Sequence, residues 1–262
     1  MTLVMGVLNV TPDSFSDGGE HATVDGAVTH GLLMARQGAA IVDVGGESTR
    51  PGALRVPPEE ETARVVPVIQ ALTSQGVVCS VDTMRAATAR AAAAAGASIV
   101  NDVSGGLADP GMFEEVAGLD VDYVLMHWRA HSVEMQQHTH YDDVVADVLG
   151  ELLERRDAAV AAGIPSERII LDPGIGFSKT GEQNWELLRA LSRFRGTGHR
   201  LLVGVSRKSF LGDLLDGREP LQRDAATAAV TTWCALHGVW GVRTHEVSSQ
   251  LDSIKVAARL SV

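Results

Sequence analysis

Cysteine is scarce in this sequence, and long apolar runs are absent. Its 262 residues include only two cysteines, Cys79 and Cys234, so a disulfide framework cannot be what stabilises the fold. We find neither the pattern of a secretory signal peptide nor an apolar stretch long enough to span a membrane. We therefore expect a cytoplasmic protein whose two cysteines pack as small hydrophobic side chains.

Positive charge is the second scarcity. Lys and Arg number 22 against 33 Asp and Glu, which gives a formal net charge of −11 and a pI near 5.2. The basic residues form no stripe, and a protein that binds a phosphate backbone needs one. The composition therefore excludes nucleic acid as a partner, and we expect small-molecule substrates and no membrane contact.

Nucleotide-binding glycine motifs are missing too. No Gly-x-Gly-x-x-Gly follows the first apolar segment and no Walker loop is present, which disfavours a doubly wound open sheet, the competing architecture. The sequence does contain eight apolar segments, each followed by a helix-forming stretch, in a chain that is 45% hydrophobic. This alternation predicts a (β/α)8 TIM barrel, built as a single domain over residues 1–262.

The first apolar segment, Leu3 to Leu8, has no polar interruption and so indicates a strand buried on both faces. It ends on Asn9, and the polar loop that follows is long enough for Thr11 to Ser16 to fold over a ligand. The other strands also end on polar residues. A closed barrel gathers such strand ends around one mouth, here Asn9, Asp43, Asp82, Asn101, His127, Asp172, Ser206 to Lys208, and Arg243 to His245.

The helix-forming stretches have recognisable ends. Val24 to Gln37 has helical spacing of its apolar residues and stops before Gly38, a typical left-handed cap. Pro58 and three following glutamates open another helix, in agreement with its dipole. Because proline lacks the N–H that an interior turn needs, we expect Pro67 to kink or shorten that helix.

Two kinds of side chain are expected at the mouth. Asp82, Asn101, Asp172 and Lys208 combine acceptors, donors and one cation, which suits a flat heterocycle with N–H groups and a carbonyl on its edge. A carboxylate can accept from an exocyclic amine and a ring N–H together. A second set offers an oxygen ligand and two donors, as a phosphate and its magnesium ion require: Asn9, Arg243 and His245.

Each of these residues also has an ordinary structural interpretation. A single aspartate after a strand commonly caps the next helix, and we keep that interpretation for Asp43. Lys208 could be a solvated lysine, and Arg243 could pair with Glu246 at little energetic benefit. The pair His138 and His140, followed by two aspartates, resembles metal-ligand spacing. It has no third ligand at a fixed distance, so we expect a solvent-exposed loop there.

Seven motifs, in order along the whole chain, resemble those of dihydropteroate synthase, the folate-pathway target of sulfonamides. They are Gly6-Val-Leu-Asn-Val-Thr-Pro-Asp-Ser-Phe-Ser-Asp-Gly-Gly19, Asp43-Val-Gly-Gly-Glu-Ser-Thr-Arg-Pro-Gly52, Ser80-Val-Asp-Thr83, Asn101-Asp-Val-Ser-Gly-Gly106, Leu171-Asp-Pro-Gly-Ile-Gly-Phe177, Ser206-Arg-Lys-Ser-Phe210 and Arg243-Thr-His-Glu246. Met126-His-Trp-Arg129 looks like the actinobacterial form. Motifs of this length do not recur by chance in the same order.

The resemblance implies an enzyme that joins 4-aminobenzoate to 6-hydroxymethyl-7,8-dihydropterin diphosphate and releases diphosphate, with Mg2+ as cofactor. It implies that Asn9, Lys208, Arg243 and His245 take part in catalysis and that Asn9 is the metal ligand. The pterin would be held by Asp82, Asn101, Asp172 and Lys208, with Met126 and Phe177 beside it. The aminobenzoate pocket would comprise Thr49, Arg50, Pro51, Phe177, Lys208 and Ser209. The family also implies a homodimer.

Departures from the family pattern are small. Thr244 stands where many members have valine, and Glu246 where aspartate is common, and neither has an expected ligand role. Because Ser48 to Pro51 are kept and nothing is inserted beside Phe15, we expect sensitivity to sulfonamides. Two other functions stay open: a pterin-binding barrel without synthase activity, and a methyl-transferring pterin barrel that serves a corrinoid partner.

Overall fold

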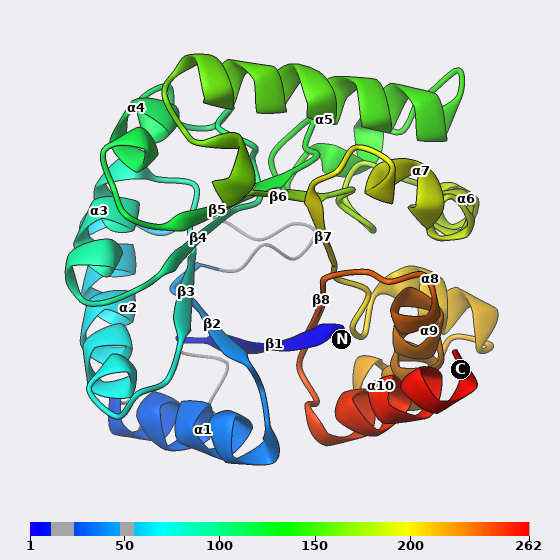
Figure 1. Cartoon of the computed structure of the whole chain (residues 1–262), viewed down its shortest axis with the longest axis horizontal. Coiled ribbons are helices and arrows are strands. Elements are labelled where there is room, and N and C mark those ends of the chain that lie inside the picture. The colour runs from blue at the N-terminus through cyan, green and yellow to red at the C-terminus, as the bar shows by residue number, and fades with distance from the viewer. Residues whose placement is uncertain (12–23, 48–54, 262) are drawn as a thin grey trace.

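A computed structural model describes residues 1–11, 24–47 and 55–261. Eight parallel strands close into a barrel in the order in which they occur along the chain, and the helices form a ring around it (Figure 1). The last strand pairs with the first, so that Leu3 lies opposite Gly241. The predicted (β/α)8 TIM barrel is therefore confirmed.

The strands are short and almost entirely buried. Their bounds are β1 Leu3–Asn9, β2 Ile41–Gly45, β3 Cys79–Asp82, β4 Ile99–Asp102, β5 Asp122–Met126, β6 Ile169–Asp172, β7 Arg200–Val203 and β8 Gly241–Thr244. The α-helices are α1 Val24–Gln37, α2 Pro58–Thr73, α3 Ala86–Ala94, α4 Met112–Ala117, α5 Val144–Ala161, α6 Gly181–Arg189, α7 Leu191–Arg195, α8 Ser209–Leu214, α9 Asp224–Leu236 and α10 Ser248–Leu260. Short 3-10 turns are η2 Met135–Gln137, η3 Ser166–Arg168 and η4 Pro220–Arg223.

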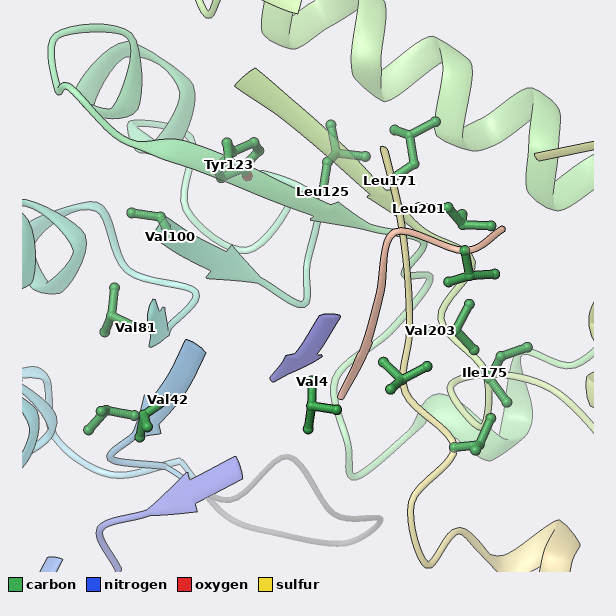
Figure 2. Packing of buried hydrophobic residues seen from close by; sticks show 14 of the residues in the cluster. Val4, Val42, Val81, Val100, Tyr123, Leu125, Leu171, Ile175, Leu201 and Val203 are labelled. Atoms are coloured by element: carbon green, nitrogen blue, oxygen red, sulfur yellow. The ribbon is translucent and has the colours of Figure 1, made fainter. Parts of the chain in front are cut away.

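Two apolar clusters follow from the alternation of side chains along each strand. The larger cluster lies between strands and helices; Figure 2 shows part of it, including Val4, Val42 and Leu171. The smaller cluster consists of Met5, Ile41, Ile99, Val124, Ile170 and Leu202, with Trp240 packed against it. It fills the barrel interior below the mouth, as in other barrels of this kind.

Pro67 was expected to kink or shorten its helix. Pro67 lies inside α2, which continues to Thr73, so the helix is not shortened there. Packing of its fully buried side chains, Val65, Val68, Ile69 and Leu72, offsets the one lost hydrogen bond. Cys79 and Cys234 are free and buried, as expected. Within the described part of the chain, no helix is long and apolar enough to cross a membrane.

Candidate functional site

Arg243, at the end of β8, lies between two carboxylates of neighbouring strands. Its Nε donates to Asp43 Oδ2 and one terminal nitrogen donates to Asp82 Oδ2, both over 2.6 Å. Burial by itself lowers the pKa of this guanidinium, but the charges of Asp43 and Asp82 raise it overall. The arginine is therefore permanently charged and held in one orientation. The suggested pairing of Arg243 with Glu246 does not occur, because Glu246 accepts from the backbone N–H groups of Ser248 and Ser249.

Asp43 corrects one expectation, because it does not cap a helix. Its side chain is fully buried at the mouth, and Oδ2 accepts from Asn101 Nδ2 over 2.9 Å as well as from Arg243. Its other oxygen, Oδ1, has no hydrogen-bond partner among the described residues. Asp43 therefore fixes both the amide of Asn101 and the guanidinium of Arg243, and joins the two predicted halves of the site.

Asp82 is buried beside Arg243. Burial raises the pKa of its carboxyl to about 7, although the positive charge of Arg243 acts in the opposite direction. A Cβ placed on Gly45 would lie 3.7 Å from Asp82 Oδ2 and 3.7 Å from Asn9 Oδ1. The side-chain oxygens of Asn9 and Asp82 therefore both lie close to Gly45.

Asp172 and Lys208 form the opposite part of the mouth. Burial raises the pKa of Asp172, against the nearby charges of Lys208 and Arg243, and its Oδ1 accepts from Gly174 N over 2.7 Å. Burial likewise lowers the pKa of Lys208 to about 8, against the charge of Asp172. A Cβ on Gly204 would lie 3.6 Å from Arg243 Cβ and 3.9 Å from Lys208 Nζ. Lys208 and Arg243 therefore stand side by side at one mouth.

Lys208 is also fixed by the loop that follows β6. Its Nζ donates to the carbonyl of Ile175 and lies 4.7 Å from the ring centroid of Phe177. A Cβ on Gly176, where φ is +84°, would lie only 2.8 Å from Lys208 Cδ. A side chain at Gly176 would thus displace the lysine as well as strain the backbone.

An apolar wall borders the polar groups. Met84, Val103 and Met126 form a small buried cluster, and Phe177 and Ala108 pack against it. Met126 and Phe177 were predicted to lie here. Met84 and Val103 were not, because the prediction at these two strand ends considered only the polar residues. The wall gives a flat ring an apolar surface opposite the hydrogen-bonding groups.

His245 is held by Ser206. Its backbone N–H donates to Ser206 Oγ over 3.1 Å, and its ring Nδ1 lies 3.0 Å from the same oxygen.

Ser209 is exposed at the start of α8. Thr49, Arg50 and Pro51, and the loop between Thr11 and Ser16 beyond its first residue, lie outside the described residues. The segment with His138 and His140, whose spacing resembles that of metal ligands, was expected to be a solvent-exposed loop. His140 and Asp142 are indeed exposed there, 3.8 Å apart. No cluster of three or more His, Cys, Asp or Glu suited to a metal occurs in residues 1–11, 24–47 and 55–261.

A cluster of charged residues joins Glu47 and Arg55 to the neighbouring helices. Glu47 accepts from Arg55 Nε over 3.0 Å, from Val56 N over 3.1 Å and from Arg85 over 3.1 Å. Arg85 also pairs with Glu61, which is 1% exposed. These contacts fix Glu47, Arg55 and Val56 against α2 and α3, and no pattern in the sequence predicted them.

Arg85→Met is expected to destabilise the protein by about 3 kcal/mol, because it leaves the buried carboxylate of Glu61 without its cation. Urea unfolding would measure this loss. Arg90→Met is the control, since Arg90 is 62% exposed in its pair with Glu115 and should change stability by less than about 0.5 kcal/mol. An equal effect of both substitutions would contradict the role given to Arg85.

One protein-family model matches most of the chain. The model described as "Pterin binding enzyme" matches residues 5–245. The dihydropteroate synthase of Mycobacterium leprae is 54% identical over 259 residues, which are 97% of this chain and 91% of that protein. That of Synechocystis is 44% identical over 260 residues, or 99% of this chain and 90% of that protein.

Solved structures agree with these relatives. Dihydropteroate synthase of Xanthomonas albilineans with 4-aminobenzoic acid superimposes with a TM-score of 0.94 at 45% identity, covering 100% of this chain and 93% of that one. The same enzyme in complex with 7,8-dihydropteroate gives 0.91 at 43%, with 100% and 94% coverage. The Yersinia pestis enzyme with a sulfonamide drug gives 0.93 at 40%, with 99% and 94% coverage. This chain therefore belongs to the family of pterin-binding enzymes and, within it, to the dihydropteroate synthases, which are transferases of folate synthesis.

Proposed function

We propose that this protein condenses 6-hydroxymethyl-7,8-dihydropterin diphosphate with 4-aminobenzoate, giving 7,8-dihydropteroate and diphosphate in a Mg2+-dependent reaction. The observation that carries the proposal is that Lys208 and Arg243 both approach Gly204 and so lie close together at the mouth. Lys208 belongs with the carboxylate of Asp172. Arg243 belongs with Asn9 and His245, the residues expected to bind phosphate and its magnesium ion. A substrate that is a pterin at one end and a diphosphate at the other matches this arrangement.

The pterin ring fits between the polar strand ends and the apolar wall. Asp172 can accept from the exocyclic amine and the neighbouring ring N–H, while Lys208 and the amide of Asn101 can bind the carbonyl and ring nitrogens. The bond to Asp43 orients the Asn101 amide, since its Nδ2 is turned toward Asp43. The methionines of the wall supply an adaptable apolar surface for the ring face.

The diphosphate end falls to Arg243 and His245. Asp43 and Asp82 hold two of the five N–H donors of Arg243, so the guanidinium is oriented before the substrate arrives. Ser206 fixes the ring of His245 in the same way. Donors fixed before the reaction stabilise the charge that develops on a leaving group at no cost of reorganisation.

The donor chemistry near Asn9 fits a magnesium ion. Asn9 offers one neutral oxygen close to Gly45 and Asp82, and Mg2+ commonly takes few protein oxygens together with substrate phosphates and water. Asn9 would hold the ion, which when bound neutralises charge on the leaving diphosphate. Asp43 and Asp82 are engaged by Arg243, so this chain contributes to the metal mainly through Asn9.

The residues present suit cleavage of the C–O bond before or during attack by the amine. The methylene carbon loses diphosphate, and the electron-rich pterin delocalises the positive charge that remains. The arylamine nitrogen then forms the new C–N bond and loses a proton. Because that nitrogen is nucleophilic without prior deprotonation, the mouth needs no strong general base.

Incubation of the purified full-length protein with the pterin diphosphate, 4-aminobenzoate and Mg2+ is expected to yield dihydropteroate and diphosphate in equal amounts. Chromatographic detection of both products would test the proposal. Pterin binding without conversion would favour a barrel that only binds pterin. Methyl transfer from a methylated pterin to a corrinoid would favour the methyl-transferring alternative.

Sulfamethoxazole is expected to inhibit this reaction in competition with 4-aminobenzoate, because it carries the same aniline group and the loop sequence Ser48 to Pro51 is kept. Initial rates at several concentrations of both compounds should show a higher KM for 4-aminobenzoate at unchanged kcat. An unaltered KM at millimolar inhibitor would contradict this expectation.

A homodimer and a cytoplasmic location stay predictions. Apolar side chains exposed on α8, η4, α9 and α10 support the first: Leu214, Leu221, Trp233, Leu236, Val256 and Leu260. An apolar surface of this kind is typical of contacts between subunits.

A further inference from the structure

Lys179 is a buried lysine that the proposed reaction does not use. It is 3% exposed, and its Nζ contacts His127 Nδ1 at 2.9 Å, the carbonyl of Gly174 at 3.1 Å and that of Phe177 at 2.9 Å. Each contact takes one of the three N–H donors of a charged ammonium. Burial lowers the pKa of Lys179 to about 7, against the charge of Asp172, so a cation at this position must be matched by its surroundings.

His127 accepts a hydrogen bond from Lys179 and is itself bonded to Glu151 on α5. Burial foremost, and then the charge of Lys179, lower the pKa of His127 to about 4, so the ring is neutral. Since Nδ1 accepts from the ammonium, Nε2 carries the proton and donates to Glu151 Oε2 over 2.9 Å. Arg129 Nε donates to the same carboxylate over 3.1 Å. Lys179 is thus the inner end of a chain of contacts that begins on a helix outside the barrel.

The segment that Lys179 holds has an unusual backbone. Between Asp172 and Lys179, φ is +65° at Gly174, +84° at Gly176 and +51° at Ser178. A non-glycine residue in this region costs free energy and persists only where neighbouring contacts enforce it. Gly176 N donates to Asn184 Oδ1 over 2.6 Å, and Tyr141 donates to the carbonyl of Ser178 over 3.0 Å. This loop is therefore held from several sides.

Lys208 and Lys179 hold the same loop. Lys208 donates to the carbonyl of Ile175, and Lys179 to the carbonyls of Gly174 and Phe177. The whole chain has only one other lysine, Lys255 on the surface of α10. An ammonium has three N–H donors, so Lys208 can donate to a substrate as well as to the carbonyl of Ile175. Lys179 uses its donors on His127, Gly174 and Phe177 and is therefore the cation that serves this loop alone.

We propose that Lys179 is a positioning residue for the pterin: its ammonium holds the loop from Gly174 to Phe177 so that Asp172 and Phe177 keep their places while Lys208 binds the substrate. The proposal rests on the proposed function only in taking pterin as the ligand. It does not require turnover. Lys179 itself acts through the backbone and touches no reacting atom.

The test measures binding of 6-hydroxymethyl-7,8-dihydropterin by calorimetry with the full-length protein. Lys179→Met keeps the length of the side chain but removes the donors, and is expected to raise the Kd at least tenfold. Lys179→Gln keeps a neutral donor and should give an intermediate Kd. Lys255→Met, which alters only an exposed lysine, should leave the Kd within twofold of the parent.

A general loss of stability has to be separated from loss of positioning. Leu72→Ala opens a cavity in the core beside α2, and is expected to destabilise the protein by about 2–5 kcal/mol without changing the pterin Kd. Should Lys179→Met fail to fold, Lys179→Gln decides alone. A Kd within twofold of the parent for the folded Lys179 variant would overturn the proposal, and so would an equal rise for Leu72→Ala. Absence of pterin binding by the parent protein would instead refute the proposed function.

Discussion

Lys208→Met is expected to lower the affinity for free 6-hydroxymethyl-7,8-dihydropterin about 100-fold, a loss of roughly 3 kcal/mol. The substitution removes a charged donor at the pterin edge. It also leaves the buried carboxylate of Asp172 without the cation that acts most strongly against its raised pKa. Calorimetry measures the loss directly, because no turnover is needed.

Asp172→Asn should weaken the same binding to a similar degree, since an amide cannot accept from two neighbouring donors of the ring and at the same time keep the bond to Gly174 N. The two substitutions together should cost less than the sum of their separate effects, because the residues interact. If either single variant bound the pterin as tightly as the parent, Asp172 and Lys208 would not be the pterin ligands.

Asp43→Asn is expected to reduce kcat about 100-fold, or roughly 3 kcal/mol of transition-state stabilisation. Oδ2 of Asp43 accepts from Arg243 and from Asn101. The single oxygen of an asparagine could accept both bonds, but the side chain carries no charge to hold the guanidinium, and its amide N–H groups would be buried where Oδ1 has no partner among the described residues. Because we propose that Arg243 stabilises the leaving group, we expect kcat to fall more than the affinity for the unreacted pterin.

The fold offers a matched control for this prediction. Asp122, at the start of β5, holds Arg200 through two bonds of 2.6 and 2.8 Å at the end of the barrel away from the mouth. Asp122→Asn removes the same kind of carboxylate-guanidinium pair without touching the site, and should leave kcat within about twofold. Steady-state kinetics of both variants would check this. Equal losses in the two would mean that Asp43 acts only through the stability of the barrel.

The local pattern of the sequence determined the architecture. An apolar strand can tolerate a polar residue at its carboxyl end only if that end is open, so eight such strands indicate one mouth that holds Asn9, Asp82, Asn101 and Asp172. Helix ends were equally local, as at Gly38, where φ is +104°. These features depend on neighbours a few residues away, which is why they can be read from the sequence.

Tertiary structure decided which way individual side chains face and what they meet. Asp43 stands in the middle of β2, and only the register of β2 against β1 and β3 turns it into the mouth rather than toward a helix. Lys179 precedes the Thr180 cap of α6, where a helix dipole disfavours a cation. That conflict was a signal in the sequence, but its resolution depends on His127 and Glu151, from two other elements. Such contacts join residues far apart in the chain, and no local pattern encodes their distance.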